Sequence, residues 1–581
     1  MLRSLNNHSF ITTSVFLVCF LLSLLLVQAI RQPMVSSSAP QLLSDPFLQL
    51  PTTNSVRVVW FTEFAGSDHK VAYGDNLKSS AKATTTKLSR VREDRDSRLG
   101  KSQKDRYKQL TKRDIWRHEA EVIGLTPNAR VSYRVTSVRE DGKAFSSGKY
   151  SLAPKPTPGV PLKILLTSDH QLKPMVAANL QKVVETVGRV DGVFMAGDLV
   201  NIPDRASEWF DDNRGGAFFP CLQGKANYEL AKTVYKGGEI IQHAPLFTAI
   251  GNHEVMGRFG NDSLGGEFDD AFPRKLAQQL QAKQGISDRT LKDNSFNTDT
   301  YEEIFTLPES SSGGRTYYAT TFGDVRLVVL YATNMWRSPN IDKDTRGKYQ
   351  ERQQDLNHPE RWGHGQVIFG DLAKGTPQYN WLVQELESSE FRRAKYKIVM
   401  LHHPPHSLGD NIVPAYTEPV PMVERNSDGS IKAVRYEYPK EADYIIRDVM
   451  PLLEAAKVQL VFYGHSHLWN RFVSPSGRHF LETSNVGNSY GAAAMGNKQR
   501  QVPPGNDKDY VAIGDPNGLE PIVPTIAPLL DKDGQPTPYI ASNDITIFSI
   551  FDTSTGTIGS YRFDTQKPKS KVVKFDEFKL K

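Results

Sequence analysis

Pro245-Leu-Phe-Thr-Ala-Ile250 runs directly into Gly251-Asn252-His253-Glu254. The apolar run predicts a buried strand, and the glycine allows the backbone to bend where that strand stops. Three polar side chains then emerge together at the carboxyl end of the strand, which is where open α/β sheets bind their ligands. An Asn-His pair in this position is also typical of an ordinary turn. The residues at the other strand ends decide between a ligand-binding site and a turn.

Four further predicted strands are followed at once by polar clusters of the same chemical kind. These clusters are Asp169-His170-Gln171, Gly197-Asp198-Leu-Val-Asn201, His402-His403-Pro-Pro-His406 and Gly464-His465-Ser466-His467. Each has an ordinary explanation when it is taken alone, because an aspartate can cap a helix and a histidine can lie in a core or in a turn. Together, carboxylates, an amide and imidazoles at the strand ends of one domain are the ligands that hold borderline divalent metals. We therefore expect the clusters to meet in one metal site.

The chain around these clusters alternates between predicted strands and helices. The strands are predicted at Lys163–Ser168, Gly192–Ala196, Leu246–Ile250, Thr316–Thr320, Val325–Tyr331, Tyr396–Leu401 and Val458–Tyr463. The helices are predicted at Met175–Val187, Gln378–Glu387 and Ala442–Ala456. Two alternating runs, Asp544–Ile550 and Gly556–Phe563, predict a hairpin that closes the sheet. This order indicates a two-layered or sandwiched α/β domain, with polar segments at 255–312, 333–375 and 492–540 that form loops over the active face or are partly disordered.

The residues from Asp45 to Leu152 follow a β pattern instead. Short strands are predicted at Ser55–Thr62, Lys70–Gly74, Glu119–Gly124 and Ala129–Ser137. Several short strands without a helical period indicate a small β-sandwich. It contains no catalytic cluster, so we expect it to act as a spacer or to shape the surface. The proline-rich run Ala153–Gly159 is a stiff linker and marks the clearest domain boundary in the chain.

The composition is typical of a globular protein, with 39% apolar and 23% charged residues among 581. The net charge of +6 is unevenly placed, because 12 Lys or Arg residues stand against 5 Asp or Glu residues between Lys87 and Arg117. This run alternates in sign and contains few apolar residues, which predicts a solvated loop or insertion. A contact with nucleic acid or another anionic surface is the alternative for this run, and no nucleic-acid partner is expected.

The first 29 residues predict export. Arg3 precedes an almost uncharged apolar segment, Phe16–Val27, which ends shortly before Ala29. This pattern is typical of a secretory signal that is removed after Ala29. The alternative is an uncleaved membrane anchor, because the apolar stretch is just long enough to span a bilayer. In both cases the remainder is secreted or otherwise extracytoplasmic. Cys19 lies in this segment, which leaves Cys221 without an intrachain disulfide partner.

Taken in order, the five clusters resemble the pattern of the calcineurin-like metallophosphoesterase superfamily, which is Asp-x-His, Gly-Asp, Gly-Asn-His, a single His and Gly-His-x-His. The resemblance spans roughly residues 161–490 and implies a four-layer α/β/β/α sandwich. It also implies a site for two metal ions, with Fe, Mn and Zn as the candidates. The implied ligands are Asp198 bridging both ions, Asp169 and His467 on the first ion, and Asn252, His402 and His465 on the second.

Two positions depart from the family pattern. Gln171 stands where the superfamily usually has a second histidine, and an amide oxygen is a weaker ligand than imidazole. We predict that Gln171 is still a metal ligand, which holds the first metal loosely or favours a harder ion. Asn201 stands where purple acid phosphatases have a metal-binding tyrosine. A colourless enzyme without phenolate-to-iron charge transfer is therefore expected.

A second resemblance completes the predicted organisation. Gly124–Tyr133 resembles the closing strands of the fibronectin type III-like domain that precedes the catalytic domain in plant-type purple acid phosphatases. The chain then divides into a signal or anchor (1–29), a fibronectin type III-like β-sandwich (44–152) with a charged insertion (82–117), a linker (153–160), a metallophosphoesterase domain (161–565) and a solvated basic tail (566–581).

The implied chemistry is hydrolysis of phosphate esters. Two cations lower the pKa of a shared water, and the resulting metal-bridging hydroxide attacks phosphorus in line. His253 would contact the phosphate or protonate the leaving oxygen, and either Glu254 or a main-chain carbonyl would orient it. Asp198 and Asn252 complete the catalytic set. The candidate substrate-binding residues are Asn252, His253, His403 and His406, of which the last two fit a structural role equally well.

The leading interpretation is an exported phosphomonoesterase, similar to an acid phosphatase, that acts on small phosphate esters. A phosphodiesterase or nucleotidase is the first alternative, because the same metals support it and only the loop shapes distinguish the two. A binding or adhesion protein with an inert phosphatase domain is the alternative of another class. The nearly complete set of ligand positions argues against that alternative, so a metal-dependent phosphoric ester hydrolase is expected.

Overall fold

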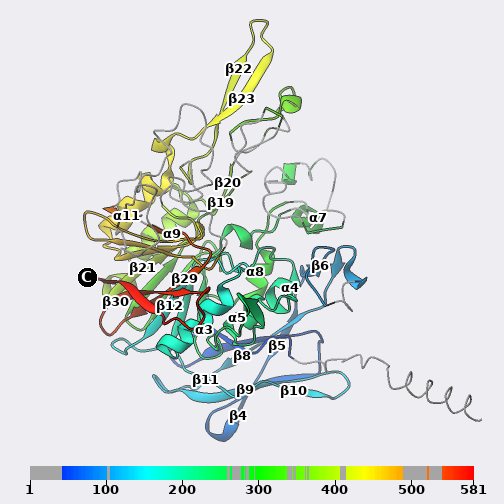
Figure 1. Cartoon of the computed structure of the whole chain (residues 1–581), viewed down its shortest axis with the longest axis vertical. Coiled ribbons are helices and arrows are strands. Elements are labelled where there is room, and N and C mark those ends of the chain that lie inside the picture. Colours follow the sequence, from blue (N-terminus) through cyan, green and yellow to red (C-terminus); the bar gives the residue numbers. More distant parts are fainter. Residues whose placement is uncertain are drawn as a thin grey trace, which may run out of the picture. The chain divides into compact units, whose positions relative to one another are not determined.

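The structure is a computed structural model of the chain (Figure 1). It describes residues 42–100, 105–257, 262–264, 277–279, 282, 285, 287–293, 295–336, 343–344, 349–359, 362, 366–405, 414–487, 520–521 and 539–581. The predicted signal or anchor and the predicted substrate contact at His406 lie outside these residues, so both stay predictions. Within the described ranges, no helix combines the length and the apolar character needed to span a membrane.

Two sheets form the centre of the α/β region. The first has the strand order β16 (Leu246–Thr248), β13 (Gly192–Met195), β12 (Lys163–Thr167), β29 (Ile545–Asp552), β30 (Thr557–Asp564) and β31 (Val573–Lys579). The second has the order β17 (Tyr318–Phe322), β18 (Val325–Val329), β21 (Tyr396–Met400), β24 (Leu460–Tyr463), β26 (His479–Thr483), β25 (Trp469–Val473) and β27 (Glu520–Pro521), with β28 (Tyr539–Ile540) paired to β25. Strands β12, β13 and β16 run parallel, as do β18, β21, β24 and β26. Parallel strands end at the same edge of a sheet, and this edge carries the predicted ligands.

Side chains of the second sheet alternate between two cores. In β18, Leu327 belongs to the first core and Val328 to the second, and β21 and β24 alternate in the same way. The first core also contains the other sheet and α3 (Val176–Val187), whereas the second contains α9 (Pro377–Leu386) and α11 (Met450–Ala455). Figure 1 shows the same order, with α9 and α11 beside β21 and with α3 beside β12. The predicted four-layer α/β/β/α sandwich is confirmed.

One predicted helix is irregular. The stretch predicted at 442–456 contains a π-helical turn, Ile445–Val449, which leads directly into α11. Pro451 lies in the first turn of α11 and has no backbone N–H to donate to the preceding turn. The wider π turn is the local consequence of this missing donor.

The N-terminal β region consists of two facing sheets. The strand order in one sheet is β1 (Phe47–Gln49), β2 (Val56–Thr62), β8 (Trp116–Val122) and β5 (Thr84–Lys87). The order in the other sheet is β10 (Ala144–Ser146), β9 (Val131–Val138), β3 (Asp68–Tyr73) and β4 (Ser79–Lys82). In this second sheet, β11 (Tyr150–Leu152) also pairs with β9. Alternate residues of both sheets meet in a separate small core that includes Trp60 and Tyr133. This arrangement confirms the predicted small all-β sandwich.

The charged insertion is solvated only in part, and the prediction of a solvated loop is wrong for its central residues. Arg90, Arg92, Glu93 and Asp94 are all buried, and β6 (Arg92–Glu93) pairs with β7 (Thr111–Lys112). Asp204 and Arg205 of the α/β region pair with Arg90 and Asp94, at 3.1 and 2.7 Å, whereas Glu93 pairs with Arg113 of the insertion itself at 3.0 Å. Composition showed the charges but could not show that some of their partners lie elsewhere in the chain.

The basic tail forms a strand, although most of its side chains stay exposed to solvent. Strand β31 pairs with β30 in antiparallel register, and Phe578 and Leu580 are buried against the first core. Lysine residues lie near the apolar residues along this stretch, so its composition predicts solvation but does not predict the strand. The tail therefore completes the first sheet.

The segments predicted as loops contain short elements within their described parts. They include α7 (Asp288–Asp293) and α8 (Asp299–Ile304) in the first segment and the paired strands β19 (Thr333–Trp336) and β20 (Gln366–Phe369) in the second. The third segment contains β27 and β28. Elsewhere the chain forms α4 (Ala206–Phe210), α5 (Phe218–Leu222), α10 (Ser389–Arg393) and the pair β14 (Tyr228–Leu230) and β15 (Thr233–Tyr235). The hairpin of β22 (Val420–Arg425) and β23 (Ile431–Glu437) was not predicted, and Figure 1 shows it extending away from the two central sheets.

Candidate metal centre

The predicted ligand clusters follow five parallel strands at the edge where those strands end. Asp169 follows β12, Asp198 follows β13, and the turn Asn252–Glu254 follows β16. In the second sheet, His402 follows β21 and His465 follows β24. The two sheets meet here, since the backbone N–H of His465 donates to both carboxylate oxygens of Asp169, at 3.0 and 2.9 Å. Residues separated by 296 positions in the sequence thus share one centre.

Two glycines allow the clusters to approach each other so closely. A Cβ atom on Gly251 would lie 2.2 Å from Oδ1 of Asp198, and one on Gly464 would lie 2.2 Å from Oδ2 of Asp169. Real Cβ atoms essentially never make contacts below 3.0 Å, so no other residue fits either position without displacing a carboxylate. Gly251 and Gly464 are therefore required, because a carboxylate of the neighbouring cluster leaves no room for a Cβ atom.

Several predicted ligands hold a left-handed backbone conformation that only glycine adopts readily. They are Asp169 (φ 58°), Gln171 (φ 40°), Asp198 (φ 55°), His465 (φ 80°) and His467 (φ 56°). Sparsely populated conformations of this kind cost on the order of 1–3 kcal/mol each and persist only where the surrounding structure holds them. Their concentration at one sheet edge indicates that the backbone is bent in order to aim these side chains at a common point.

One group of donor atoms comes from Asp169, Asp198 and His467. One donor atom from each residue lies within 4.8 Å of the others, and all three residues are buried. Gln171 lies beside this group, because its Nε2 donates to Oδ2 of Asp198 at 2.6 Å. Its buried Oε1 has no hydrogen-bond partner among the described residues. A cation would satisfy this oxygen, so the site fits a metal ion here.

A second group of donor atoms comes from the rings of His402, His403 and His465, which again lie within 4.8 Å of one another. Oδ1 of Asn252 lies 3.1 Å from Nε2 of His402 and 3.1 Å from Nδ1 of His465. Nε2 of His402 also lies 3.2 Å from Oδ2 of Asp198. Asp198 therefore lies next to both groups, which is where a bridging carboxylate would have to be.

The sequence suggested His403 for substrate contact, and the structure places it in the second donor group. Its ring stacks on that of His465 with centroids 3.8 Å apart, and its Nδ1 lies 3.0 Å from the hydroxyl of Thr333. The hydroxyl of Tyr416 donates to its backbone carbonyl at 2.8 Å. His403 is thus a further candidate donor, which the sequence missed because the family pattern has a single histidine at this strand end.

Burial and neighbouring charges set the protonation of the centre. Burial raises the pKa of Asp169 to about 6, with His402 opposing the rise and Asp198 adding to it. Burial also acts to raise the pKa of Asp198, but the neighbouring His402 and His253 outweigh it and hold that pKa below its usual value. Burial acts to lower the pKa of His402, whereas the Asp198 carboxylate raises it to about 9. Two buried carboxylates in contact with imidazoles form a centre that favours positive charge.

Glu254 supports the backbone and does not orient the candidate catalytic histidine. Its carboxylate accepts the backbone N–H groups of Asp198, Leu199 and Gly251, at 2.8, 2.7 and 2.7 Å. The ring of His253 is held by a main-chain carbonyl instead, since its Nδ1 lies 2.9 Å from the oxygen of Asn201. Of the two predicted ways to orient His253, the structure shows the main-chain carbonyl.

The sequence also missed a carboxylate that holds the Gly-His-Ser-His turn. Glu482 in β26 is buried, and its Oε1 accepts the backbone N–H of Ser466 at 2.8 Å. Ser484 and Asn470 donate to the same carboxylate, both at 2.6 Å. An acidic residue that directly follows the apolar pair Phe480-Leu481 within a strand is the signal that points to such a residue, because a buried carboxylate needs partners.

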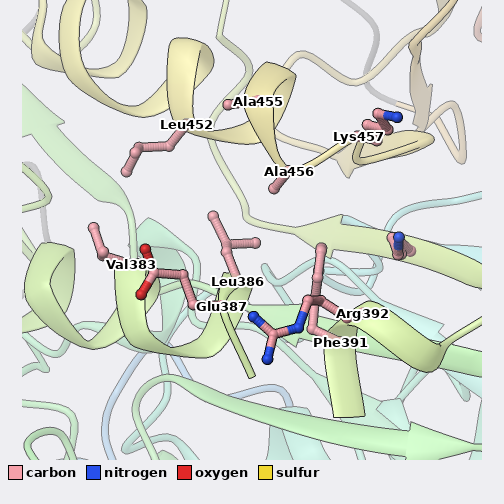
Figure 2. Close-up of a pocket in the computed structure, with 10 residues that line it drawn as sticks. Val383, Leu386, Glu387, Phe391, Arg392, Leu452, Ala455, Ala456 and Lys457 are labelled. Atoms are coloured by element: carbon pink, nitrogen blue, oxygen red, sulfur yellow. The ribbon is translucent and has the colours of Figure 1, made fainter. Parts of the chain in front are cut away.

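The pocket in Figure 2 is separate from this centre. It has a volume of about 400 Å³ and is lined by side chains of α9, α10, β21 and α11. Its wall is apolar at Leu386 and Leu452 and charged at Arg392 and Lys397. Lys397 lies near the start of β21, whereas His402 follows the end of that strand. None of the predicted site residues lines this pocket.

Comparisons with known proteins agree with this geometry. The model of the family described as calcineurin-like phosphoesterase matches residues 162–468. The structure of purple acid phosphatase PPD1 from yellow lupin (Lupinus luteus) seeds is similar to this chain, with a TM-score of 0.51, 15% sequence identity and coverage of 92% of this chain and 73% of the lupin chain. At that identity the likeness shows the fold. A structure of PhoD is similar with a TM-score of 0.44, 13% identity and coverage of 93% of both chains. No curated protein matched the chain.

Proposed function

The chain belongs to the calcineurin-like phosphoesterase family, and we propose that it is a phosphomonoesterase of the acid-phosphatase type. The family model covers the whole run of clusters from Asp169 to His467. The fold shared with a purple acid phosphatase, which includes the N-terminal β-sandwich, supports this choice within the family. The substrate class that we propose is a small phosphate monoester.

The observation that carries the proposal is the position of Asp198 between the two donor groups. Asp198 belongs to the first group together with Asp169 and His467, and its Oδ2 lies 3.2 Å from Nε2 of His402 in the second group. Carboxylate, amide and imidazole donors suit Fe, Mn or Zn. We propose that these residues, with Gln171, Asn252 and His465, hold two such ions. When bound, these ions neutralise phosphoryl oxygens and make water acidic enough to act as a nucleophile near neutral pH.

His253 is the residue that we propose for substrate contact and proton transfer. A backbone carbonyl only accepts hydrogen bonds, so the contact with Asn201 requires the proton of the His253 ring to be on Nδ1. Its Nε2 is then the nitrogen that faces the leaving oxygen of the substrate, and it donates a proton to that oxygen from the doubly protonated ring. The residue is half-buried, so the ring can contact the protein through Nδ1 while it remains accessible to a bound ester.

The test is an assay of the purified protein with p-nitrophenyl phosphate and bis(p-nitrophenyl) phosphate, after loading with Mn, Zn or Fe. We expect turnover of the monoester to exceed turnover of the diester. The Asp198→Asn variant should lose several orders of magnitude in kcat, because it removes the carboxylate shared by both groups. Asp576→Asn is a matched control, since Asp576 pairs with Arg471 at 2.7 Å and touches neither donor group.

Each outcome decides between the functions. Faster turnover of the diester would replace the proposal with a phosphodiesterase. No turnover of either ester with any of the metals would favour an inert, binding-type protein. Wild-type turnover in Asp198→Asn would overturn the roles assigned to the centre.

A further inference from the structure

A single peptide unit connects His253 to a buried carboxylate. The carbonyl of Asn201 accepts from Nδ1 of His253 at 2.9 Å, and the N–H of Ile202 donates to Oε2 of Glu208 at 3.0 Å. Both groups belong to the one peptide between Asn201 and Ile202. The N–H and C=O of a trans peptide are coplanar and point in opposite directions. Holding the N–H therefore fixes the direction in which the carbonyl meets the histidine.

Glu208 is itself held firmly. Its Oε2 also accepts the N–H of Asn201 at 2.7 Å, so two successive backbone donors converge on one oxygen. Its Oε1 pairs with Arg205 at 2.9 Å, and the side chain of Glu208 is only 6% exposed. An ionised carboxylate in such surroundings keeps its position because every departure would leave a buried charge without a partner.

The connection continues into the charged insertion of the N-terminal region. Nη2 of Arg205 lies 2.7 Å from Oδ2 of Asp94, whose side chain is fully buried. The same carboxylate oxygen accepts the backbone N–H of Leu264 at 2.8 Å. The backbone N–H of Arg92 donates to the carbonyl of Asp204 at 2.8 Å, so the insertion lies along the loop that leads to Glu208. Asp94, Arg205 and Glu208 thus form an unbroken line of charges that ends at the peptide beside His253.

We propose that Glu208 is a positioning residue for His253, that it acts through the Asn201–Ile202 peptide, and that Asp94 of the N-terminal insertion anchors it through Arg205. The inference rests on the function proposed for His253. It assigns the N-terminal β region a part in preparing the catalytic centre, in addition to the expected role of spacer.

Two physical effects follow from this arrangement. The fixed carbonyl keeps the proton of His253 on Nδ1, so Nε2 is the nitrogen presented to the substrate. The negative charge of Glu208 at the N–H also polarises the peptide, which makes its carbonyl a stronger acceptor. The loop is tied to the first donor group as well, because Nδ2 of Asn201 donates to the carbonyl of Gln171 at 2.8 Å.

The experiment compares Glu208→Gln and Asp94→Asn with the wild-type protein. Glu208→Gln keeps the shape and one acceptor oxygen but removes the charge, and Asp94→Asn removes the anchor at a distance from the centre. Glu385→Gln is the matched control, since Glu385 forms an equally close buried pair with Arg326, at 2.7 Å, on the outer side of the second sheet. For each protein, kcat and KM with p-nitrophenyl phosphate, the metal content and the ¹⁵N signals of the histidine rings are measured.

We expect Glu208→Gln to lower kcat by about 10–100-fold, the usual effect of removing a residue that orients a functional group, while KM changes little. The ring signals of His253, identified by their loss in His253→Ala, should move from a single Nδ1–H form towards a mixture of both tautomers. Asp94→Asn should shift both readouts in the same direction by a smaller factor. Metal content should stay at the wild-type level in both variants.

Wild-type kcat together with an unchanged ring tautomer in Glu208→Gln would overturn the proposal. An equal loss of kcat in Glu385→Gln would also overturn it, because the effect would then be a general result of losing a buried ion pair. If Glu208→Gln does not fold, the same two readouts on Asp94→Asn decide. If the wild-type protein turns over no ester, the proposed function fails, whereas the ring signals still test the positioning of His253.

Discussion

Nε2 of His402 lies 3.2 Å from Oδ2 of Asp198, and these two buried side chains join the strand ends of two different sheets. His402 follows β21 of the second sheet, and Asp198 follows β13 of the first. The contact therefore depends on how the two sheets pack, and any ion bound between the two donor groups would bridge them. Metal binding and the stability of the sandwich should then be coupled.

Removal of metal should lower the thermal stability of the whole protein. A ligand present at about 100 times its Kd stabilises the folded state by about 2.7 kcal/mol, and a chelator removes this contribution. We expect the melting temperature to fall by several degrees with EDTA and to recover when Zn or Mn is added back. Differential scanning calorimetry measures both changes. The Asp198→Asn variant is the control and should show a much smaller response to EDTA; an equal response would place the ion elsewhere.

Gln171 should contribute measurably to metal affinity. Its buried Oε1 lacks a hydrogen-bond partner in the described part of the chain, beside the carboxylate of Asp198. Gln171→Ala should weaken binding of one of the two ions by about tenfold, and Gln171→His should strengthen it because imidazole is the better donor for Zn. Isothermal titration of the metal-free protein with Zn measures both effects. Unchanged affinity in Gln171→Ala would show that this amide is not a ligand.

The iron-loaded protein should be colourless. The side chain of Asn201 donates to the carbonyl of Gln171 at 2.8 Å, and the two donor groups consist of carboxylate and imidazole atoms, with amides beside them. Without a phenolate ligand there is no phenolate-to-iron charge transfer. A visible absorption spectrum after loading with Fe tests this directly. An intense band in the visible region would mean that a tyrosine reaches the metal.

Acid should destabilise the N-terminal β-sandwich through His118. Burial lowers the pKa of His118 to about 3, and its two ring nitrogens pair with the hydroxyls of Thr62 and Thr85 at 2.8 and 2.9 Å. The folded pKa lies below the unfolded value of about 6.5, so the unfolded chain takes up the proton first as the pH falls. The contribution of the neutral His118 ring to the stability of the folded state is complete above pH 6.5, and it is lost as the pH falls towards 3.

The loss from His118 should approach about 1.4 kcal/mol in the free energy of unfolding for each pH unit below 6.5. Urea unfolding at pH 7.5 and pH 5.5 measures it. His118→Gln keeps hydrogen-bonding groups but does not titrate, so the difference in pH dependence between the two proteins isolates this residue. Parallel curves for wild type and variant would contradict the prediction.

The sequence was sufficient to predict the sheets and the candidate ligands because both have local signals. Apolar runs such as Val325–Tyr331 mark the strands, and each ligand cluster directly follows its own strand. A shared edge for parallel strands then brings the clusters together without further information. The predicted metal-ligand roles stay predictions; they concern Asp169, Gln171, Asp198, Asn252, His402, His465 and His467.

The supporting residues could not be predicted, because Asp94 and its partner Arg205 are 111 positions apart and because the contacts of Glu208 depend on the fold of a loop. Glu208 interacts with the loop beside His253, and Asp94 reaches that loop only through Arg205. A charged residue in a buried ion pair looks like a solvated one when composition alone is considered. The burial of the insertion is therefore a tertiary property, which depends on the packing of the β region against the loop that carries Asn201.

Strand β31 makes the end of the chain part of the first sheet, and this has a practical consequence for handling the protein. Deletion of the residues after Thr565 would leave the backbone N–H and C=O groups of β30 exposed along its outer edge. Such an edge pairs readily with strands of other molecules, so the shortened protein should aggregate. An affinity tag is better appended after Lys581 through a flexible spacer than substituted for the terminal residues.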